Sequence, residues 1–588
     1  MAPSKEKVKM SVVGDLQKQI KGILNEFAQT PIGSDRVVVE ITNDAAFGEI
    51  TTNAAMVLAK DFRMPPLALA KKLLDAIGQI DFVKNVEIAG PGFINVTLHE
   101  WRWLEELKKI VTLGSLYTTP KLATGEAVHI EFVSANPTGP MHAGHVRNAI
   151  LGDTIATLLK KVGYSVYKEY YINNAGKQVE FLGRSVYLRY KEALGQELPT
   201  NAFDGDLYPG EYLVPIGQDI ARQYEGKWLD CPEHEWGPFF QDFTVNAMMD
   251  IIRQDLKDLG VVMDFYASEK QLITDGKVEK VVQQLTAQND VYEGVLTPPK
   301  GVIVDDWEER PQLLFRATKY GDDVDRPLRK SDGLWTYFAS DIAYHFDKIQ
   351  RGFSNMINVL GADHCGYVKR ITAATEAISQ KTAKLTVKLF QIVNFFENGQ
   401  PIKMSKRAGV FVSSRDIVQK VGKDVARFMM VSRSNGSVID FDFQKAIEQS
   451  QDNPIFYIQY AHSRICSVLN YAKEIFPGLG EEEARQCDDL SFLGNAEEMA
   501  LIRTIAHWPE IIEQAAKALE PHRIANYLYT VANDFHRLWN FGKTSLHLRF
   551  VNRDSEAFTR AKLFLLSGVA TVLRDGLELL GVVPLRRM

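Results

Sequence analysis

The chain has 588 residues, of which 45% are hydrophobic and 24% charged, and this length predicts several globular domains. Its four cysteines include no CxxC pair, so we expect neither a structural zinc site nor a disulfide framework, and this cysteine usage favours a reducing compartment. The start lacks the apolar run of a signal peptide and no uninterrupted apolar stretch has membrane length, so we expect a cytoplasmic protein with no membrane contact.

Three regions are predicted along the chain. Residues 1–112 have the mixed pattern of an α+β domain, and the polar residues 117–126 predict a linker after it. Residues 126–445 predict a Rossmann-like, doubly wound parallel sheet. An insertion at about 183–330 is expected to separate the two halves of this fold, and residues 453–588, which lack strand-like alternation, predict a helix bundle.

The second region opens with a strand–loop–helix–strand pattern. Residues 127–133 predict a buried strand, residues 146–162 a helix with apolar positions at helical spacing, and residues 164–172 another strand. Gly163 is typical of a helix C-terminus. The tetrad His142-Ala143-Gly144-His145 therefore stands where the loop enters the helix.

This first tetrad suits phosphate chemistry. A helix start offers unpaired backbone N–H groups and a positive dipole end to the phosphates of ATP. His142 and His145 can donate hydrogen bonds to a reacting phosphate, and Gly144 lets a nucleotide approach the backbone closely. The alternative is a metal pair, but zinc needs a third ligand, and the metalloprotease pattern needs a glutamate where Ala143 stands.

A second tetrad, Lys403-Met404-Ser405-Lys406, lies in the polar segment 402–409. Lys403 and Lys406 on a mobile loop can close over the phosphates of ATP, and Mg²⁺ bound to those phosphates completes their neutralisation. The alternative is a basic surface loop without a role. In this order the two tetrads resemble the ATP-handling pair of a class I aminoacyl-tRNA synthetase.

Longer strings narrow the resemblance. Residues 131–145, 335–345, 361–370, 424–428 and 453–464 are similar to arginyl-tRNA synthetases, and the likeness runs from the N-terminal domain to the last residue. It implies an N-terminal domain that contacts the tRNA elbow and a C-terminal helical domain that binds the anticodon stem and loop.

The resemblance also implies roles for single residues in the arginine pocket. Glu131 and Asp341 would face the substrate guanidinium, with Tyr337 alongside its planar group. Ser134 and Asn136 would hold the α-amino and carboxylate end. His142 would lie nearby, where arginine meets ATP.

Two features of the pocket follow from spacing. Tyr337 and Asp341 are four residues apart, so on a helix they would share a face; a solvated surface acid is the alternative for Asp341. Asp363 is a further candidate for a substrate contact, although its neighbour His364 could serve instead and either could be an ordinary loop residue.

For tRNA, the resemblance points to both ends of the chain. Phe93 and Asn95 are exposed-loop candidates for reading a base, unless Phe93 packs in the domain core. In the helix bundle the candidates are Tyr460, Arg464, Asn533 and Met588. Residues 521–588 carry ten Lys or Arg and five Asp or Glu, a local charge of +5 that supports RNA binding weakly against the chain's net charge of −6.

The function that the resemblance implies is ligation of L-arginine to tRNA(Arg), with ATP consumed through an enzyme-bound arginyl-adenylate. A monomer is expected, and adenylate formation is expected to require bound tRNA. Two alternatives stay open at this point. One is a nucleotidyltransferase that joins small molecules without tRNA, and the other is an RNA-binding paralogue without catalysis.

Overall fold

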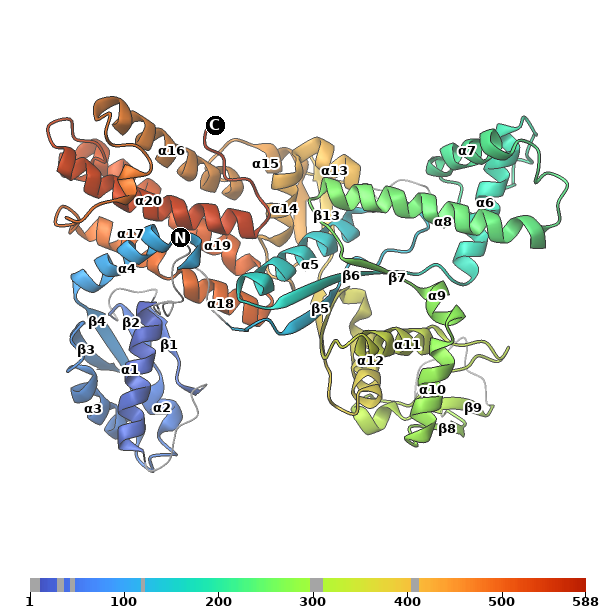
Figure 1. Cartoon of the computed structure of the whole chain (residues 1–588), viewed down its shortest axis with the longest axis horizontal. Helices are drawn as coiled ribbons and strands as arrows, with labels where there is room; N and C mark the ends of the chain where they lie inside the picture. The colour runs from blue at the N-terminus through green and yellow to red at the C-terminus, as the bar shows by residue number, and fades with distance from the viewer. Residues whose placement is uncertain (1–10, 29–35, 43–47, 118–121, 297–309, 403–411) are drawn as a thin grey trace, which may run out of the picture.

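The computed structural model describes residues 11–28, 36–42, 48–117, 122–296, 310–402 and 412–588. The molecule is elongated, with the N-terminal domain beside the C-terminal helix bundle at one end and a parallel sheet with its flanking units toward the other (Figure 1). The expected combination of an α+β domain, a Rossmann-like domain and an all-α domain is therefore confirmed. Within the described ranges, no helix is both long enough and apolar enough to cross a bilayer.

The N-terminal domain is a four-stranded antiparallel sheet with helices packed on it. The strand order is β1-β2-β4-β3, and β4 alternates inward-facing apolar residues such as Ile94 and Val96 with outward-facing ones. Its elements are α1 (Val12–Phe27), β1 (Val39–Ile41), β2 (Ile50–Thr52), α2 (Ala54–Leu58), α3 (Pro66–Ile77), β3 (Val83–Ala89) and β4 (Phe93–Leu98).

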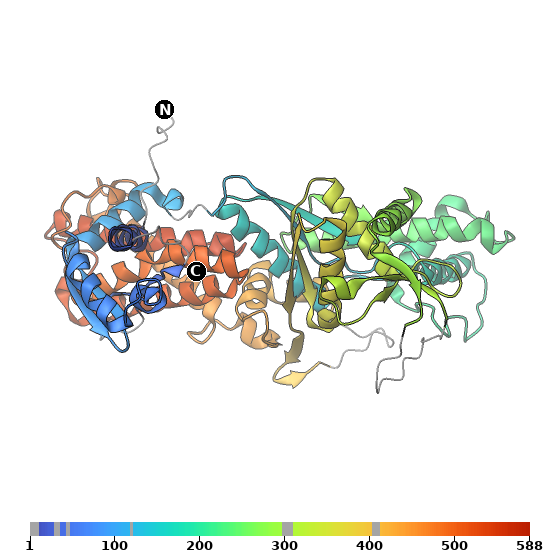
Figure 2. The same cartoon turned by 90° about the horizontal axis from the view of Figure 1, so that it is seen from below.

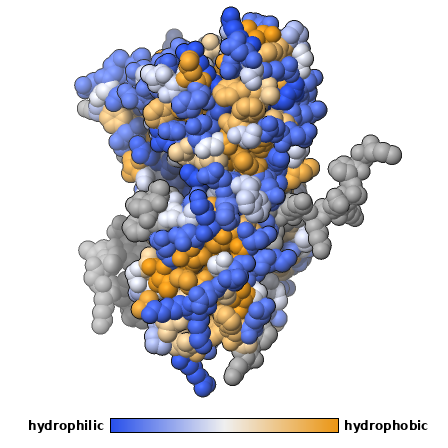
Figure 3. Space-filling model, turned by 90° about the vertical axis from the view of Figure 1, so that its left-hand side faces the viewer, coloured by the Kyte–Doolittle hydropathy of each residue, from blue (hydrophilic) through white to orange (hydrophobic). Residues whose placement is uncertain are grey.

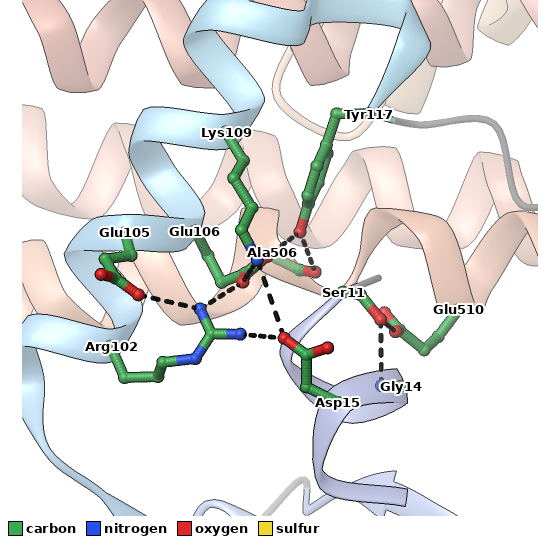
Figure 4. Close-up of polar contacts among 10 residues, drawn as sticks. All are labelled: Ser11, Gly14, Asp15, Arg102, Glu105, Glu106, Lys109, Tyr117, Ala506 and Glu510. Atoms are coloured by element: carbon green, nitrogen blue, oxygen red, sulfur yellow. Dashed lines mark hydrogen bonds and ion pairs between the residues drawn. The ribbon is translucent and has the colours of Figure 1, made fainter. Parts of the chain in front are cut away.

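Helix α4 (Glu100–Leu113) connects this domain to the C-terminal bundle, which consists of α16 (Pro454–Ile475), α17 (Ala496–Ala506), α18 (Trp508–Ala518), α19 (His522–Thr544) and α20 (Glu556–Leu579). Helix α4 packs against α17 and α20. Gly568 of α20 permits this close approach, because a Cβ there would lie 2.7 Å from Leu107 Cδ1. A polar cluster lies at the same junction: Arg102 of α4 bonds to Asp15 of α1 and to Glu106, and Tyr117 donates to Glu106 (Figure 4).

The central domain contains a five-stranded sheet in the order β12-β11-β5-β6-β7, with every neighbouring pair parallel. Its strands are β5 (Ala127–Glu131), β6 (Ser165–Ile172), β7 (Phe265–Ser268), β11 (Asn355–Gly361) and β12 (Lys384–Phe390). Strands β6 and β7 are added in turn on one side of β5, and β11 and β12 are then added in turn on its other side. The switch point between β5 and β11 is where such folds bind ligands, beyond the carboxyl ends of the strands.

Helices cover both faces of this sheet. Helix α5 (Ala143–Lys161) lies on one side, and α11 (Tyr337–Gln350) and α12 (Cys365–Ile378) lie on the other (Figure 2). Right-handed crossovers that run in opposite directions along the sheet require this arrangement. Because α5 follows β5 and α11 precedes β11, the two helices flank the switch point.

The expected single insertion at 183–330 is wrong in one respect, because β7 lies within it and is the edge strand of the parallel sheet. The interval is thereby divided into two units. The first contains α6 (Lys177–Ala193), α7 (Val214–Tyr224) and α8 (Glu233–Asp258); the second contains α9 (Glu269–Thr274), α10 (Lys277–Ala287) and the antiparallel strands β8 (Val291–Gly294), β9 (Gln312–Phe315) and β10 (Arg326–Pro327). Four residues are too few for strand alternation to mark β7 in the sequence.

A connecting region joins the sheet to the bundle. It comprises β13 (Val393–Glu397), β14 (Gln400–Pro401), α13 (Ser414–Val421), α14 (Lys423–Val431), β15 (Ile439–Asp442) and α15 (Phe443–Ile447). Arg427 of α14 is almost fully buried and donates to Asp153 of α5 and to the carbonyls of Leu259 and Leu580. This guanidinium thus ties α5, the end of α8 and the last helix of the bundle together.

Candidate active site

The first tetrad lies at the N-terminus of α5, as the sequence predicts. His142 is the N-cap residue: its Nδ1 accepts a hydrogen bond from Gly144 N at 3.2 Å, and His145 Nδ1 accepts one from His142 N at 3.3 Å. The two rings are stacked with 3.8 Å between centroids. Since each Nδ1 is an acceptor, the neutral rings carry their hydrogen on Nε2, which makes Nε2 the donor of each imidazole.

The second tetrad, Lys403 to Lys406, lies outside the described residues, but the residues on both sides of it are placed. Ile402 N donates to Phe395 O at 2.8 Å on one side. On the other side, Ala143 N donates to Val412 O at 3.1 Å, and Ser414 N donates to Met141 O at 2.8 Å. The segment that follows the second tetrad therefore runs antiparallel to the start of the first.

The end of β5 carries Glu131 and an unusual turn. Val133 and Ser134 have φ values of 69° and 42°, a left-handed backbone that costs a β-branched residue such as valine about 1–3 kcal/mol. Ser134 Oγ bridges this turn, since it donates to Glu131 Oε1 at 3.2 Å and accepts from Tyr171 N at 3.0 Å. Glu131 Oε2 accepts from Lys348 Nζ at 2.7 Å. Both oxygens of Glu131 are thus bonded within the chain.

Asp341 lies on α11, one turn after Tyr337, so the expected shared helix position is confirmed. Its carboxylate accepts a hydrogen bond from the Tyr367 hydroxyl. Loss of solvent contact, reinforced by the charges of Glu131 and Glu269, raises the pKa of Asp341 to about 7. Tyr337 is 59% exposed, with Lys330 Nζ 5.0 Å from its ring centroid.

Three other candidates for the substrate site are exposed. Asn136 Nδ2 donates to Gln178 Oε1 at 3.0 Å. Asp363 and His364 form the turn after β11, at the carboxyl end of that strand, and pair with each other at 3.6 Å. The structure therefore brings Glu131, Ser134 and Asp341 close to the switch point, while the roles of Asn136 and of Asp363 or His364 stay predictions.

Sequence reasoning missed several polar groups near Asp341. Glu269, the first residue of α9, is 4% exposed, and burial raises its pKa to about 7. Its Oε2, like the hydroxyls of Tyr171 and Tyr344, is buried without a hydrogen-bond partner among the described residues. Glu269 directly follows β7, so only recognition of that short strand would have revealed it. Lys348, seven residues after Asp341, could have been noticed as two helical turns along the same face.

The N-terminal candidates for tRNA are placed differently from the expectation. Phe93 and Asn95 lie on strand β4 and not in a loop, because β4 pairs with β2 and β3 along its length. Phe93 is 38% exposed, which rules out the core position, whereas Asn95 is only 8% exposed. Apolar side chains gather on the face of the N-terminal domain seen in Figure 3, and Phe27, Leu67 and Phe93 are among the large apolar residues that this domain exposes.

In the bundle, Arg464 is held by aromatic groups. Its Nη2 donates to the Tyr460 hydroxyl at 2.6 Å, and its guanidinium lies 4.0 Å from the Tyr460 ring centroid and 4.9 Å from that of Trp539. Asn533 and Met588 are exposed. Binding of RNA by these four candidates stays a prediction.

Comparison with known proteins places this architecture in a family. The model for "tRNA synthetases class I (R), catalytic domain" matches residues 106–467, that for "Arginyl tRNA synthetase N terminal domain" matches 14–98, and that for "DALR anticodon binding domain" matches 458–588. The arginine–tRNA ligase of Rhodospirillum rubrum is 49% identical over 97% of both chains, and that of Azorhizobium caulinodans is 50% identical over 94% of both. The structure of Thermus thermophilus arginyl-tRNA synthetase superposes with a TM-score of 0.72 at 21% identity, covering 98% of this chain and all of that one. The chain belongs to the class I arginyl-tRNA synthetases.

Proposed function

We propose that this chain joins L-arginine to tRNA(Arg) in two steps, the first of which consumes ATP, at the switch point between β5 and β11. The observation that carries the proposal is the convergence there of the histidine pair at the start of α5 and of Asp341, the acidic group on α11. A phosphate-binding helix start and a carboxylate for a guanidinium are the two groups that arginine activation by ATP requires.

In the first step, the arginine carboxylate attacks the α-phosphate of ATP and pyrophosphate leaves. Negative charge develops on the phosphate oxygens, and the Nε2–H donors of His142 and His145 together with the backbone N–H groups of the helix start can stabilise it. Lys403 and Lys406 would add positive charge from the segment that ends beside Met141. Mg²⁺ would enter on the triphosphate and neutralise part of its charge.

Arginine would be selected by its planar fork of donors. Asp341 can accept two of these hydrogen bonds when ionised, and Tyr337 would lie alongside the guanidinium. A neutral side chain in the same place would leave a desolvated carboxylate unpaired, which discriminates strongly against it. Ser134, Asn136 and, after β11, Asp363 would hold the amino acid end.

In the second step, a ribose hydroxyl at the 3′ end of the tRNA attacks the adenylate carbonyl and AMP leaves. The N-terminal domain, through Phe93, would contact the body of the tRNA, and the bundle, through Tyr460, Arg464 and their neighbours, would contact the anticodon arm. A monomeric state and a cytoplasmic location stay predictions.

The test is to incubate the purified chain with total tRNA, ATP and Mg²⁺ and to supply each amino acid in turn. We expect charging with arginine alone. Pyrophosphate exchange without tRNA should be absent and should appear when tRNA(Arg) is added. Charging with another amino acid would refute the proposal, and exchange that is equal with and without tRNA would refute the tRNA requirement.

A further inference from the structure

Lys348 places a fully buried positive charge beside the proposed arginine site. It lies on α11 with no exposed surface, and its Nζ is 2.7 Å from Glu131 Oε2, 3.4 Å from Asn358 Oδ1 and 4.0 Å from the Tyr344 ring centroid. A buried ammonium is costly unless it is paired, so this charge needs its carboxylate. Nothing in the two-step reaction requires a cation here.

The ion pair leads directly to the strained turn at the end of β5. Lys348 holds one oxygen of Glu131, and the other oxygen accepts from Ser134 Oγ, which in turn accepts from Tyr171 N of β6. The turn over Val133 and Ser134, with both φ values positive, is therefore fixed by a chain of bonds that begins at Lys348. Ser134 is one of the residues proposed to hold the amino acid end of the substrate.

A second chain of bonds runs from Lys348 to the backbone of Asp341. Asn358 turns its Oδ1 toward Nζ and its Nδ2 toward His345 Nε2 at 3.1 Å, and His345 Nδ1 lies 2.9 Å from Asp341 O. The carbonyl must accept from Nδ1–H, so Nε2 must accept from Asn358 Nδ2–H, and Oδ1 is left to accept from the ammonium. The direction of every bond in this chain agrees with a cation at Lys348.

We propose that Lys348 is a positioning residue for arginine activation: it neutralises Glu131, so that Asp341 is the anion left for the guanidinium, and it holds the turn that carries Ser134. This inference rests on the placement of arginine at Asp341 proposed above. Each oxygen of Glu131 keeps a lone pair that a substrate N–H could use, but Lys348 already balances its charge.

The charges around the pocket give this role a measurable consequence. Glu131 raises the pKa of Asp341 and Lys348 lowers it, with loss of solvent the largest cause of the upward shift. The other titratable or charged groups that face Asp341 and Glu131 are Glu269 of α9, Tyr367 and Arg370 of α12, Tyr171 and Glu169 of β6, His129 of β5, and Tyr344 and His345 of α11. Removing either member of the ion pair should therefore move the pH at which Asp341 ionises.

The experiment measures kcat/KM for arginine in tRNA charging between pH 5.5 and 8.5. In Lys348→Met, the uncompensated Glu131 should move the acidic limb of the profile up by about one pH unit, the lower end of the effect of a nearby charge. In Glu131→Gln, the unpaired ammonium should move it down. The double variant, which removes both charges, should return it close to the wild-type position.

Lys277→Met is the matched control. Lys277 of α10 pairs at 3.3 Å with Asp347, which lies on the same helix α11 as Lys348, and it is not part of the two chains of bonds. Its acidic limb should not move. A limb that stays fixed in Lys348→Met while the rate falls uniformly would overturn the proposal, as would a double variant that is not restored. If Lys348→Met does not fold, the Glu131→Gln and double variants still test the proposal. An acidic limb that lies at the same pH in both of them, or higher in Glu131→Gln, would overturn it.

Asp341→Asn distinguishes this inference from the arginine placement on which it rests. If Asp341→Asn leaves KM for arginine unchanged, the placement itself is wrong. If it raises KM strongly while the Lys348 and Glu131 variants leave the limb fixed, only the role of Lys348 is wrong.

Discussion

Asp341 is one of two buried acids, with Glu269, whose protonation sets the charge of the proposed arginine pocket. Loss of solvent contact raises its pKa to about 7, and the Glu131 and Glu269 charges act in the same direction, whereas the Tyr367 hydrogen bond opposes the shift. A guanidinium next to this carboxylate favours the ionised form. Binding of arginine should therefore lower the pKa of Asp341 and release a proton near neutral pH.

This linkage predicts that arginine affinity depends on pH. Below about pH 7 the carboxyl proton must leave before the guanidinium can pair, so affinity should fall as pH falls, by at most about tenfold per pH unit, and should level off above the pKa. Calorimetric titration with arginine at pH 7, in two buffers of different ionisation enthalpy, measures the released proton. Asp341→Asn removes that proton, so equal release in the variant and in the wild type would contradict the assignment.

The two lysines of the second tetrad allow a separate prediction. Lys406→Ala should slow tRNA-dependent pyrophosphate exchange by at least about tenfold, since a lost contact to developing phosphate charge costs that much or more. Lys420→Ala on helix α13, which removes an exposed pair with Glu397 of β13, should leave the rate unchanged. Equal rates for Lys406→Ala and the control would mean that the tetrad has no part in adenylate formation.

At the scale of elements, the packing of α5 on β5 depends on one glycine. A Cβ at Gly152 would overlap the ring of Phe132, which follows β5 directly. Gly152→Ala should therefore destabilise the protein by about 1–3 kcal/mol through overpacking, although alanine is the better helix former. Gly366→Ala in α12, where a Cβ would meet nothing within 4 Å, should be neutral or stabilising. Thermal unfolding of both variants tests this, and a Gly152→Ala midpoint at or above that of Gly366→Ala would contradict it.

The sequence predicts elements well where the signal is local. Helix α5 was recognisable from its apolar spacing and Gly163, because each of these acts within a few residues, although the helix begins at Ala143 and not at the expected Val146. Strand β7 was not, since four residues carry no readable period and only pairing with β6 makes them a strand. The Lys348–Glu131 pair joins residues 217 apart in the chain, a contact that only the assembled sheet creates. Asp341 could thus be singled out from the sequence as the proposed partner of the guanidinium, but the cation that balances its neighbour Glu131 could not.

At the scale of the whole molecule, the N-terminal domain meets the bundle through a polar cluster rich in acids (Figure 4). Asp15 and Glu106 pair with two cations of α4, Arg102 and Lys109, and Glu510 lies close enough for the charge of Glu106 to act on it. The Ser11 hydroxyl donates to Glu510, whose Oε2 is buried without a partner among the described residues. Because the proposed tRNA contacts lie in both of these domains, this junction sets their mutual position.

The raised pKa of Glu510 makes the stability of the junction depend on pH between about 4.5 and 8. Desolvation is the main cause that raises this pKa to about 8, and the charges of Glu106 and Glu513 add to it. Below the ordinary glutamate pKa of 4.5 both the folded and the unfolded chain hold the proton, so the folded state loses no stability from this group there. As pH rises, the unfolded chain loses the proton first, and by about pH 8 the folded state has lost stability on the order of a few kcal/mol.

Glu510→Gln should remove this dependence, because the amide replaces the protonated carboxyl and cannot ionise. We expect the thermal midpoint of the variant to rise relative to wild type between pH 6 and pH 9, with the difference largest at the alkaline end. Glu556→Gln in helix α20 is the control, because its carboxylate forms a surface pair with Arg560 and is not among the charges that act on Glu510, and it should show the wild-type profile. If the thermal midpoints of Glu510→Gln and Glu556→Gln change in parallel with that of the wild type across this range, Glu510 does not keep its proton in the folded protein.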